Sequence, residues 1–300
     1  MSKQYELVQH TTDHQQYKIL AEYELLAFLY EAISDRSRNS VKSILRRGQV
    51  FVNNKAITQF NHPLKSGDDV QIVKNEAAKR KAALIGLTIL FEDRDIIVVH
   101  KEAGLLSVAT SREDELTAHA QLMTYVKDKH PKNRIFIVHR LDRETSGVMM
   151  FAKSEQVKRQ LQDKWHEVAK ERTYVALVEG HVEKDHDTIT SYLKETATHM
   201  VYSSKSRDGL RAVTHYKKIR SNSDYSLLEV SLETGRKNQI RVHMQDIGHP
   251  VIGDKKYGST KNPIKRLGLH AKTLAFYHPR TNKLMRLTAD VPKDMARFIQ

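Results

Sequence analysis

One short polar segment carries the residues that could do chemistry. The segment HRLDRETSG, residues 139–147, runs directly into the apolar VMMFA. Within it, Asp142 lies between Arg140 and Arg143. A carboxylate between two arginines should stay ionised, because nearby positive charge favours the anion, and an ionised carboxylate can act as a nucleophile or a base. For an isolated Arg-x-Asp-Arg pattern, however, a salt bridge that fixes the loop is the commoner explanation.

Composition excludes several other kinds of chemistry. The chain of 300 residues contains no cysteine, which excludes disulfides, thiolate metal sites and a thiol nucleophile. Its 16 histidines show no HExxH-like spacing, and neither a Walker-type phosphate loop nor a GxGxxG fingerprint is present. We therefore expect no metal and no nucleotide cofactor.

Periodicity predicts the elements that position these side chains. Apolar runs at residues 134–138 and 148–152 are typical of strands, so Asp142 should lie in the loop between them. Tyr174 lies on an alternating strand, where an ordinary core tyrosine is one explanation. Arg241 lies one turn into a predicted helix, where it could equally form a surface ion pair. The mixture of strands and helices predicts an α+β fold.

The first part of the chain predicts a separate small domain. Residues 1–19 are polar and aperiodic, which suggests a flexible arm. Two short helices follow, and the second turns Val41, Ile44 and Leu45 to one face. Its other face and its ends carry only basic charges: Arg36, Arg38, Lys42, Arg46 and Arg47. Such a face suits phosphates, although a solvated surface is an equally good explanation.

Charge and hydropathy indicate the partner and the compartment. The chain has 50 Lys and Arg against 36 Asp and Glu, a formal charge of +14, which suits a polyanion such as nucleic acid or an acidic membrane surface. No apolar run approaches the roughly 18 residues of a membrane span, and the polar start lacks a secretory signal. We expect a cytoplasmic monomer that does not bind membranes.

Five segments, taken together, resemble one enzyme family, the RluA/RluD-type pseudouridine synthases. The resemblance covers about residues 88–290 and lies in AGLLSV, HRLDRETSG, ERTYVALVEG, GRKNQIRVHM, and GDKKYG with LHAKTLAFYHP. It implies a catalytic domain at 88–300, built on a central mixed, mostly antiparallel sheet flanked by helices. It also implies the isomerisation of uridine in structured RNA without a metal or a redox cofactor.

The same resemblance implies roles for individual residues. Asp142 corresponds to the catalytic aspartate of the family. Tyr174 corresponds to the aromatic residue that stacks on the target uracil and is a candidate proton acceptor, and Arg241 to the arginine that pairs with the aspartate. Arg140 would reach into the RNA and hold the target nucleotide out of its helix.

Two positions depart from the family pattern. Asn238 stands where the family commonly has histidine, and Glu102 follows Lys101 where proline is usual. Asparagine keeps hydrogen-bonding capacity but loses the imidazole, which puts the geometry near Arg241 in doubt. A binding protein that assists ribosome assembly without turnover is therefore an alternative reading.

Residues 20–74 resemble the alpha-L RNA-binding domain of a small-subunit ribosomal protein, joined by a charged linker at residues 75–87. Relatives with this domain often modify large-subunit ribosomal RNA, and shorter relatives without it act on both transfer and ribosomal RNA. The resemblance therefore favours large-subunit ribosomal RNA or its assembly intermediate as the partner, with transfer RNA as the alternative.

Overall fold

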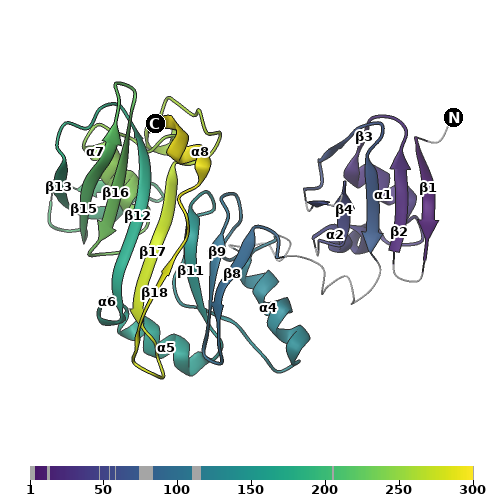
Figure 1. Ribbon diagram of the computed structural model, residues 1–300, viewed down its shortest axis with the longest axis horizontal. Coiled ribbons are helices and arrows are strands. Elements are labelled where there is room, and N and C mark those ends of the chain that lie inside the picture. The colour runs from purple at the N-terminus through teal and green to yellow at the C-terminus, as the bar shows by residue number, and fades with distance from the viewer. Residues whose placement is uncertain are drawn as a thin grey trace. The chain divides into compact units, whose positions relative to one another are not determined.

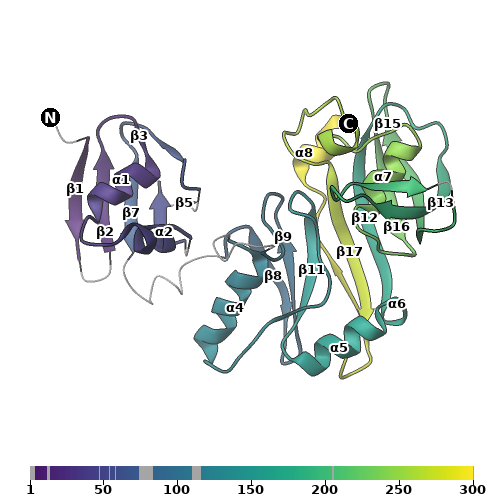
Figure 2. The ribbon, with the colours of Figure 1, turned by 180° about the vertical axis from the view of Figure 1, so that it is seen from behind.

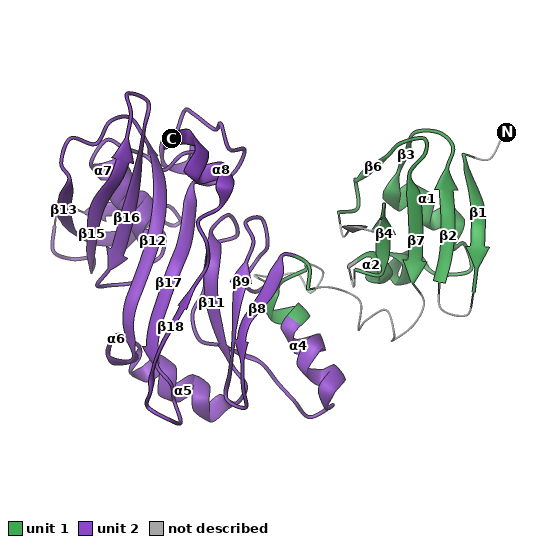
Figure 3. Cartoon of the chain, viewed as in Figure 1, with its two compact units in different colours: residues 1–85, 109–121 green, residues 86–108, 122–300 purple. Residues whose placement is uncertain are grey.

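The computed structural model describes residues 4–11, 14–46, 48–53, 55–57, 59–73, 84–109, 116–204 and 206–299. It divides into two compact units, one of residues 1–85 and 109–121 and the other of residues 86–108 and 122–300 (Figure 3). Most of the predicted linker, and Arg47, lie outside the described residues. Within the described part of the chain, no helix is long and apolar enough to cross a membrane.

The smaller unit is a five-stranded sheet of order β1-β2-β7-β4-β5 with two helices, accompanied by a two-stranded β3-β6 pair (Figure 1). Its core joins the apolar face of both helices to the inward residues of the sheet. The elements are β1 (Tyr5–His10), β2 (His14–Ile19), β3 (Tyr23–Glu24), α1 (Leu25–Ala32), α2 (Arg38–Arg46), β4 (Val50–Val52), β5 (Lys55–Ala56), β6 (Pro63–Leu64) and β7 (Asp69–Val73).

The prediction of a flexible arm is wrong for most of residues 1–19. Residues 5–10 and 14–19 form β1 and β2, which pair with each other, and β2 pairs with β7. Tyr17 and Ile19 are buried in the core of this unit. The apolar alternation in β2 is short because the inward position before Tyr17 is taken by a glutamine, Gln15, so the strand depends on pairing with the distant β7 rather than on local hydrophobicity.

Helix α2 has the two faces that its sequence predicts. Val41, Ile44 and Leu45 are buried, which confirms the predicted inward face. The side chains of Arg36, Arg38 and Lys42 are exposed. Arg46 belongs to the helix, but its side chain lies outside the described part of the structure.

The larger unit is built on an eleven-stranded sheet of order β14-β13-β15-β16-β12-β17-β11-β9-β8, with β10 beside β11 and β18 beside β17. Among the strands that the structure describes in this unit, only the β11–β17 pair is parallel, so the predicted mixed, mostly antiparallel sheet and the α+β class are confirmed. The strands are β8 (Leu87–Glu92), β9 (Ile96–Lys101), β10 (Phe136–Ile137), β11 (Ser146–Ala152), β12 (Ala169–Glu179), β13 (His186–Glu195), β14 (Val201–Ser204), β15 (Leu210–Ser221), β16 (Tyr225–Leu232), β17 (Leu269–Tyr277) and β18 (Leu284–Thr288).

Helices cover part of this sheet. They are α4 (Ala118–Lys129), α5 (Glu155–Asp163), α6 (Trp165–Val168), α7 (Gln239–Asp246) and α8 (Lys293–Ala296), with 3-10 turns η1 (Lys255–Tyr257) and η2 (Arg297–Ile299). Helix α5 buries Val157 and Leu161 against β11, and α7 buries Ile240 and Met244 against β12 and β16. Figure 2 shows α7 and α5 at opposite ends of one face of the sheet.

Gly147 brings the strands β11 and β17 together at the centre of the sheet. It pairs with Ala271 and has a φ of +121°. A Cβ at this position would lie 2.1 Å from the carbonyl oxygen of Ala271. Only glycine therefore allows this approach of the two strands, and the polar loop of residues 138–145 enters the sheet at this point.

Candidate active site

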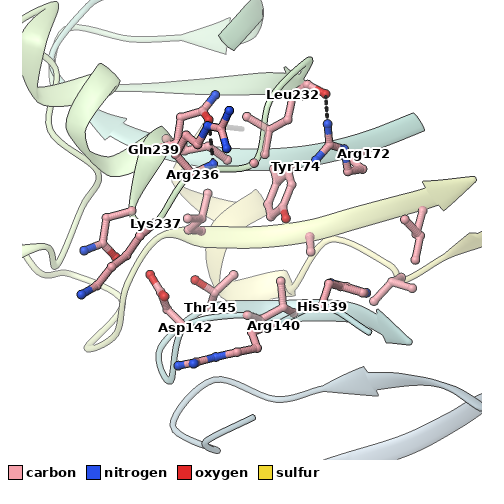
Figure 4. Close-up of a pocket in the computed structure, with 18 of the residues that line it drawn as sticks. His139, Arg140, Asp142, Thr145, Arg172, Tyr174, Leu232, Arg236, Lys237 and Gln239 are labelled. Carbon is pink, nitrogen blue, oxygen red and sulfur yellow. Dashed lines mark hydrogen bonds between the residues drawn. The ribbon is translucent and has the colours of Figure 1, made fainter. Parts of the chain in front are cut away.

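The described residues of the larger unit form a cleft of about 620 Å³. The loop of residues 138–145 makes one wall, the residues that lead into α7 make the other, and β12 and β17 form the floor. Figure 4 shows Tyr174 between the two walls, with Asp142 and Arg140 on one side and Arg236 and Gln239 on the other. A volume of this size is typical of pockets that enclose a small-molecule-sized group.

Asp142, from the loop of residues 138–145, and Arg241, from helix α7, contact each other in this cleft. Arg241 Nη1 donates a hydrogen bond of 3.2 Å to Asp142 Oδ2. The Asp142 side chain is 42% exposed, whereas the Arg241 side chain is only 15% exposed. The catalytic candidate is thus open to a ligand, and its partner is largely protected from water.

Lys101 anchors the loop that carries Asp142. Its side chain is fully buried at the end of β9. Lys101 Nζ donates to the carbonyl oxygens of Glu102 at 3.0 Å, Leu105 at 2.8 Å and Arg143 at 3.0 Å. Burial lowers the pKa of Lys101 to about 8, against the opposing effect of the charges of Glu144 and Asp142. The sequence gives Lys101 no predicted role in the site, because its contacts with Leu105 and Arg143 appear only in the folded structure.

Arg241 is held from behind by a second carboxylate. Its Nε and Nη2 donate to Asp254 Oδ2 and Oδ1 at 2.6 and 2.8 Å, and Asp254 is 1% exposed. The Tyr257 ring lies 4.8 Å from the guanidinium carbon. Burial alone would lower the pKa of Arg241, but the hydrogen bonds and charge of Asp254, together with the charge of Asp142, raise it. Arg241 is a fixed cation in this site.

Asn238 fits the site without an imidazole. It has a φ of 55°, a left-handed conformation that asparagine adopts more readily than most residues. Its Oδ1 accepts from Arg241 Nη1 at 3.0 Å, and its Nδ2 donates to the Tyr257 hydroxyl at 3.0 Å. The asparagine that departs from the family pattern therefore supports Arg241 through its own hydrogen bonds.

Tyr174 projects from β12 into the centre of the cleft (Figure 4). Burial raises the pKa of its hydroxyl to about 12; the charge of Arg172 opposes this shift and the charge of Asp142 adds to it. The hydroxyl therefore keeps its proton at neutral pH. Arg172 itself donates to the carbonyl oxygens of Leu232 and Glu233 at 3.1 and 2.7 Å and occupies the space beside Gly235.

His139 has a structural place at the far end of the cleft. Its Nε2 accepts a hydrogen bond of 3.1 Å from the Met150 amide, and its ring stacks on Trp165 at 5.1 Å. Burial, with a smaller effect of the Arg172 charge, lowers the pKa of His139 to about 4. This histidine is neutral at physiological pH, and Arg140, which follows it, is exposed at the cleft.

One group of described residues could in principle hold a metal ion: Asp93, Asp95 and His278. His278 Nε2 pairs with Asp93 Oδ2 at 2.8 Å, and Asp95 pairs with Arg280. Asp93 Oδ1 also accepts from two backbone amides. These protein partners already occupy the ligand atoms, so the group is a network that ties loops together.

Comparison with known proteins identifies the class of enzyme to which this fold and cleft correspond. Residues 95–246 match the RNA pseudouridylate synthase family. The solved structure of human RNA pseudouridylate synthase domain containing 4 covers 72% of this chain and 92% of its own, with a TM-score of 0.58 at 23% identity, a likeness of fold.

Two sequence relatives extend over nearly the whole chain. An uncharacterized RNA pseudouridine synthase of Bacillus subtilis, YlyB, is 35% identical over 91% of this chain and 92% of its own length. The ribosomal large subunit pseudouridine synthase D of Neisseria meningitidis is 32% identical over 93% of this chain and 79% of its own. The chain belongs to the RNA pseudouridylate synthase family and is an RNA pseudouridine synthase.

Proposed function

We propose that this enzyme converts specific uridines of large-subunit ribosomal RNA to pseudouridine, with Asp142 as the catalytic carboxylate. The observation that carries the proposal is the pairing of an exposed Asp142 with a largely covered Arg241 in a cleft, where Arg241 Nη1 lies 3.2 Å from Asp142 Oδ2. The similarity to relatives named as large-subunit ribosomal enzymes supports the choice of RNA.

The proposed conversion of uridine to pseudouridine uses the Asp142 carboxylate and the Arg241 guanidinium. The bond between ribose carbon 1′ and uracil nitrogen 1 breaks, the ring turns, and carbon 1′ bonds to uracil carbon 5. Carbon 5 loses its hydrogen as a proton and nitrogen 1 gains a proton, so the product is an isomer of uridine. Arg241 orients Asp142 for its part in this exchange through the hydrogen bond from its Nη1. A nucleotide bound in the cleft would displace water, which would otherwise attack ribose carbon 1′ and release free uracil.

The target base has to leave its helix before it can reach Asp142. Flipping costs a few kcal/mol, which stacking and phosphate contacts can offset. Both Tyr174 and the exposed Arg140 line the cleft, which supports stacking of Tyr174 on the flipped uracil and insertion of Arg140 into the RNA as their proposed roles. The fully protonated hydroxyl of Tyr174 is a weak proton acceptor, so we assign Tyr174 chiefly to stacking.

We further propose that the smaller unit is an alpha-L domain that binds RNA phosphates through the exposed basic side chains at α2. Lys42→Glu should weaken RNA binding and reduce the slope of log affinity against log salt by about one, because one phosphate contact is lost. Lys18→Glu is the matched control. Lys18 is exposed on the face of β2 opposite the buried Tyr17, so its slope should match that of the wild type within about 0.3. Equal slopes for Lys42→Glu and wild type would refute the assignment.

Pseudouridine mapping in cells tests the proposed target. Carbodiimide-dependent stops of reverse transcription would be mapped on total RNA from cells without the gene, rescued by wild type or by Asp142→Asn. We expect a stop in large-subunit ribosomal RNA that is lost in the deletion and restored only by wild type. Loss of a stop in transfer RNA would move the substrate there, and restoration by Asp142→Asn would exclude Asp142 from the chemistry.

A further inference from the structure

Asp254 belongs to the turn GDKKYG, for which the proposed reaction gives no role. Its side chain is almost completely buried, and both carboxylate oxygens accept hydrogen bonds from Arg241, at 2.6 and 2.8 Å. A buried carboxylate is costly unless it is paired. Both oxygens of Asp254 pair with Arg241, which is the residue that contacts Asp142.

This pairing decides which part of Arg241 can reach Asp142. Asp254 occupies the edge of the guanidinium formed by Nε and Nη2. Nη1 remains, and it donates both to Asn238 Oδ1 at 3.0 Å and to Asp142 Oδ2 at 3.2 Å. Asp142 therefore receives a single, rather long hydrogen bond through one oxygen, and Arg241 makes no bond to Oδ1.

An arginine without such a partner would behave differently. Arginine and a carboxylate prefer two parallel hydrogen bonds, which give a stronger and more rigid pair. If Arg241 were free to turn, it could bind both oxygens of Asp142 and hold the reactive carboxylate in an ion pair. One guanidinium shared by two carboxylates also leaves the group with a net negative charge, so Asp142 is only partly neutralised.

We infer that Asp254 is a positioning residue that holds Arg241 by its far edge, so that Arg241 orients Asp142 through one hydrogen bond without locking it. This inference rests on the proposed catalytic role of Asp142. It gives the GDKKYG turn a function in the reaction, although the turn contributes no residue to the lining of the cleft.

The turn itself does not depend on the Asp254 side chain. The backbone carbonyl of Asp254 accepts from the amides of Tyr257 and Ser259, each at 3.0 Å. Gly253 has a φ of +76°, and a Cβ there would lie 2.2 Å from the carbonyl oxygen of Arg266. A substitution that changes only the carboxylate of Asp254 therefore leaves the backbone of the turn in place.

Asp254→Asn tests the inference, and the chain offers a matched control. Asp294 makes the same two-bond pair with Arg266, at 2.7 and 2.9 Å, and the Arg266 side chain is also 15% exposed. This second pair lies outside the cleft lining. Asp294 is 33% exposed, so Asp294→Asn removes a pair of the same geometry from a more exposed position, without touching Arg241.

Single-turnover rates at saturating RNA, RNA dissociation constants and melting temperatures would be measured for both variants. We expect Asp254→Asn to lower the rate by on the order of 10- to 100-fold, because misplacing a catalytic group by about 1 Å costs that much. Its dissociation constant should change less than about threefold. Asp294→Asn should lose stability but keep the wild-type rate. If Asp254→Asn kept the wild-type rate while the wild type was active, the inference about Asp254 would be refuted and the proposed function would stand.

A double-mutant cycle shows whether Asp254 acts through Arg241. In an Arg241→Gln background, adding Asp254→Asn should cause no further loss of rate. It should also restore stability, because it removes a buried carboxylate that has lost its partner. The comparison of Arg241→Gln with the double variant therefore tests the inference even if Asp254→Asn alone is unstable.

A further loss of rate in the double variant would mean that Asp254 acts independently of Arg241 and would refute the inference. A wild type that forms no pseudouridine would instead refute the proposed function.

Discussion

At the scale of single residues, the site combines an exposed carboxylate with a cation that is largely covered by its neighbours. Asp142 can be reached by a nucleotide, whereas Arg241 is fixed by Asp254, Asn238 and the ring of Tyr257. An exposed ion pair contributes only about 0–1 kcal/mol to stability. The pairing of Asp142 with Arg241 therefore serves orientation more than folding, and Asp142→Asn should leave the melting temperature nearly unchanged.

Tyr174→Phe separates stacking from proton transfer. The pKa of the Tyr174 hydroxyl is about 12, so the group stays protonated below that pH in the folded enzyme. We expect Tyr174→Phe to bind RNA like wild type, to lose less than about tenfold in rate, and to show the same pH dependence between about pH 6 and pH 10. Single-turnover rates across this range provide the measurement. A step in the wild-type profile that the phenylalanine variant lacks would show that the hydroxyl titrates during the reaction.

The order of residues along the chain indicated which side chains might act but not which ones support them. The loop position of Asp142 between two strands and the place of Arg241 one turn into a helix agree with the structure. The roles of Lys101 and Asp254 depend on contacts with residues far away in sequence. No local pattern contains that information, because a buried lysine and an exposed one look alike in sequence.

At the scale of elements, the junction of β11 and β17 sets the position of the catalytic loop. The predicted strand at residues 148–152 corresponds to β11, but the parallel neighbour β17 lies more than a hundred residues further on. Sequence periodicity could predict the strands and could not predict this pairing. The N-terminal strands show the same limit, because β2 pairs with the distant β7 and β1 joins the sheet through β2.

Gly147→Ala should destabilise the larger unit strongly, because the added Cβ would collide with the backbone of Ala271 at 2.1 Å. Gly248→Ala is the matched control, since Gly248 also has a positive φ, +83°, but has open space around it. The control should cost about 1–2 kcal/mol, from backbone strain alone. We expect Gly147→Ala to cost at least twice as much in chemical denaturation. Equal losses for the two variants would contradict the role of Gly147 in strand approach.

At the scale of the whole molecule, histidines that are neutral in the folded state make stability depend on pH, and two of them act in the same direction as His139. His243 and His270 are fully buried, and burial is the main cause that lowers the pKa of each to about 4. His243 bonds to Ser191 and Thr214, and His270 bonds to Ser146. Both histidines are therefore neutral in the folded protein at pH 7 and link the sheet to α7 and to the base of the catalytic loop.

The free energy of unfolding should fall as the pH is lowered from about 6.5 towards 4. In this window the unfolded chain binds protons that the folded chain excludes, so each histidine contributes up to about 1.4 kcal/mol per pH unit. Urea denaturation between about pH 7.5 and pH 5 measures the slope. His243→Gln should reduce it, whereas His181→Gln, at an exposed position, should not. Identical slopes in all three proteins would contradict the account.

Release of tritium from uracil carbon 5 tests the central claim most directly. When the new bond forms at carbon 5, the hydrogen there is lost, so RNA labelled at this position reports each turnover. Large-subunit ribosomal RNA transcripts would be incubated with wild type, Asp142→Asn and Glu144→Gln, which removes the same charge from the same exposed loop. We predict release by wild type and Glu144→Gln, and none above background by Asp142→Asn despite normal RNA binding. Release by Asp142→Asn at a rate comparable to wild type would contradict the assignment of Asp142 as the catalytic residue.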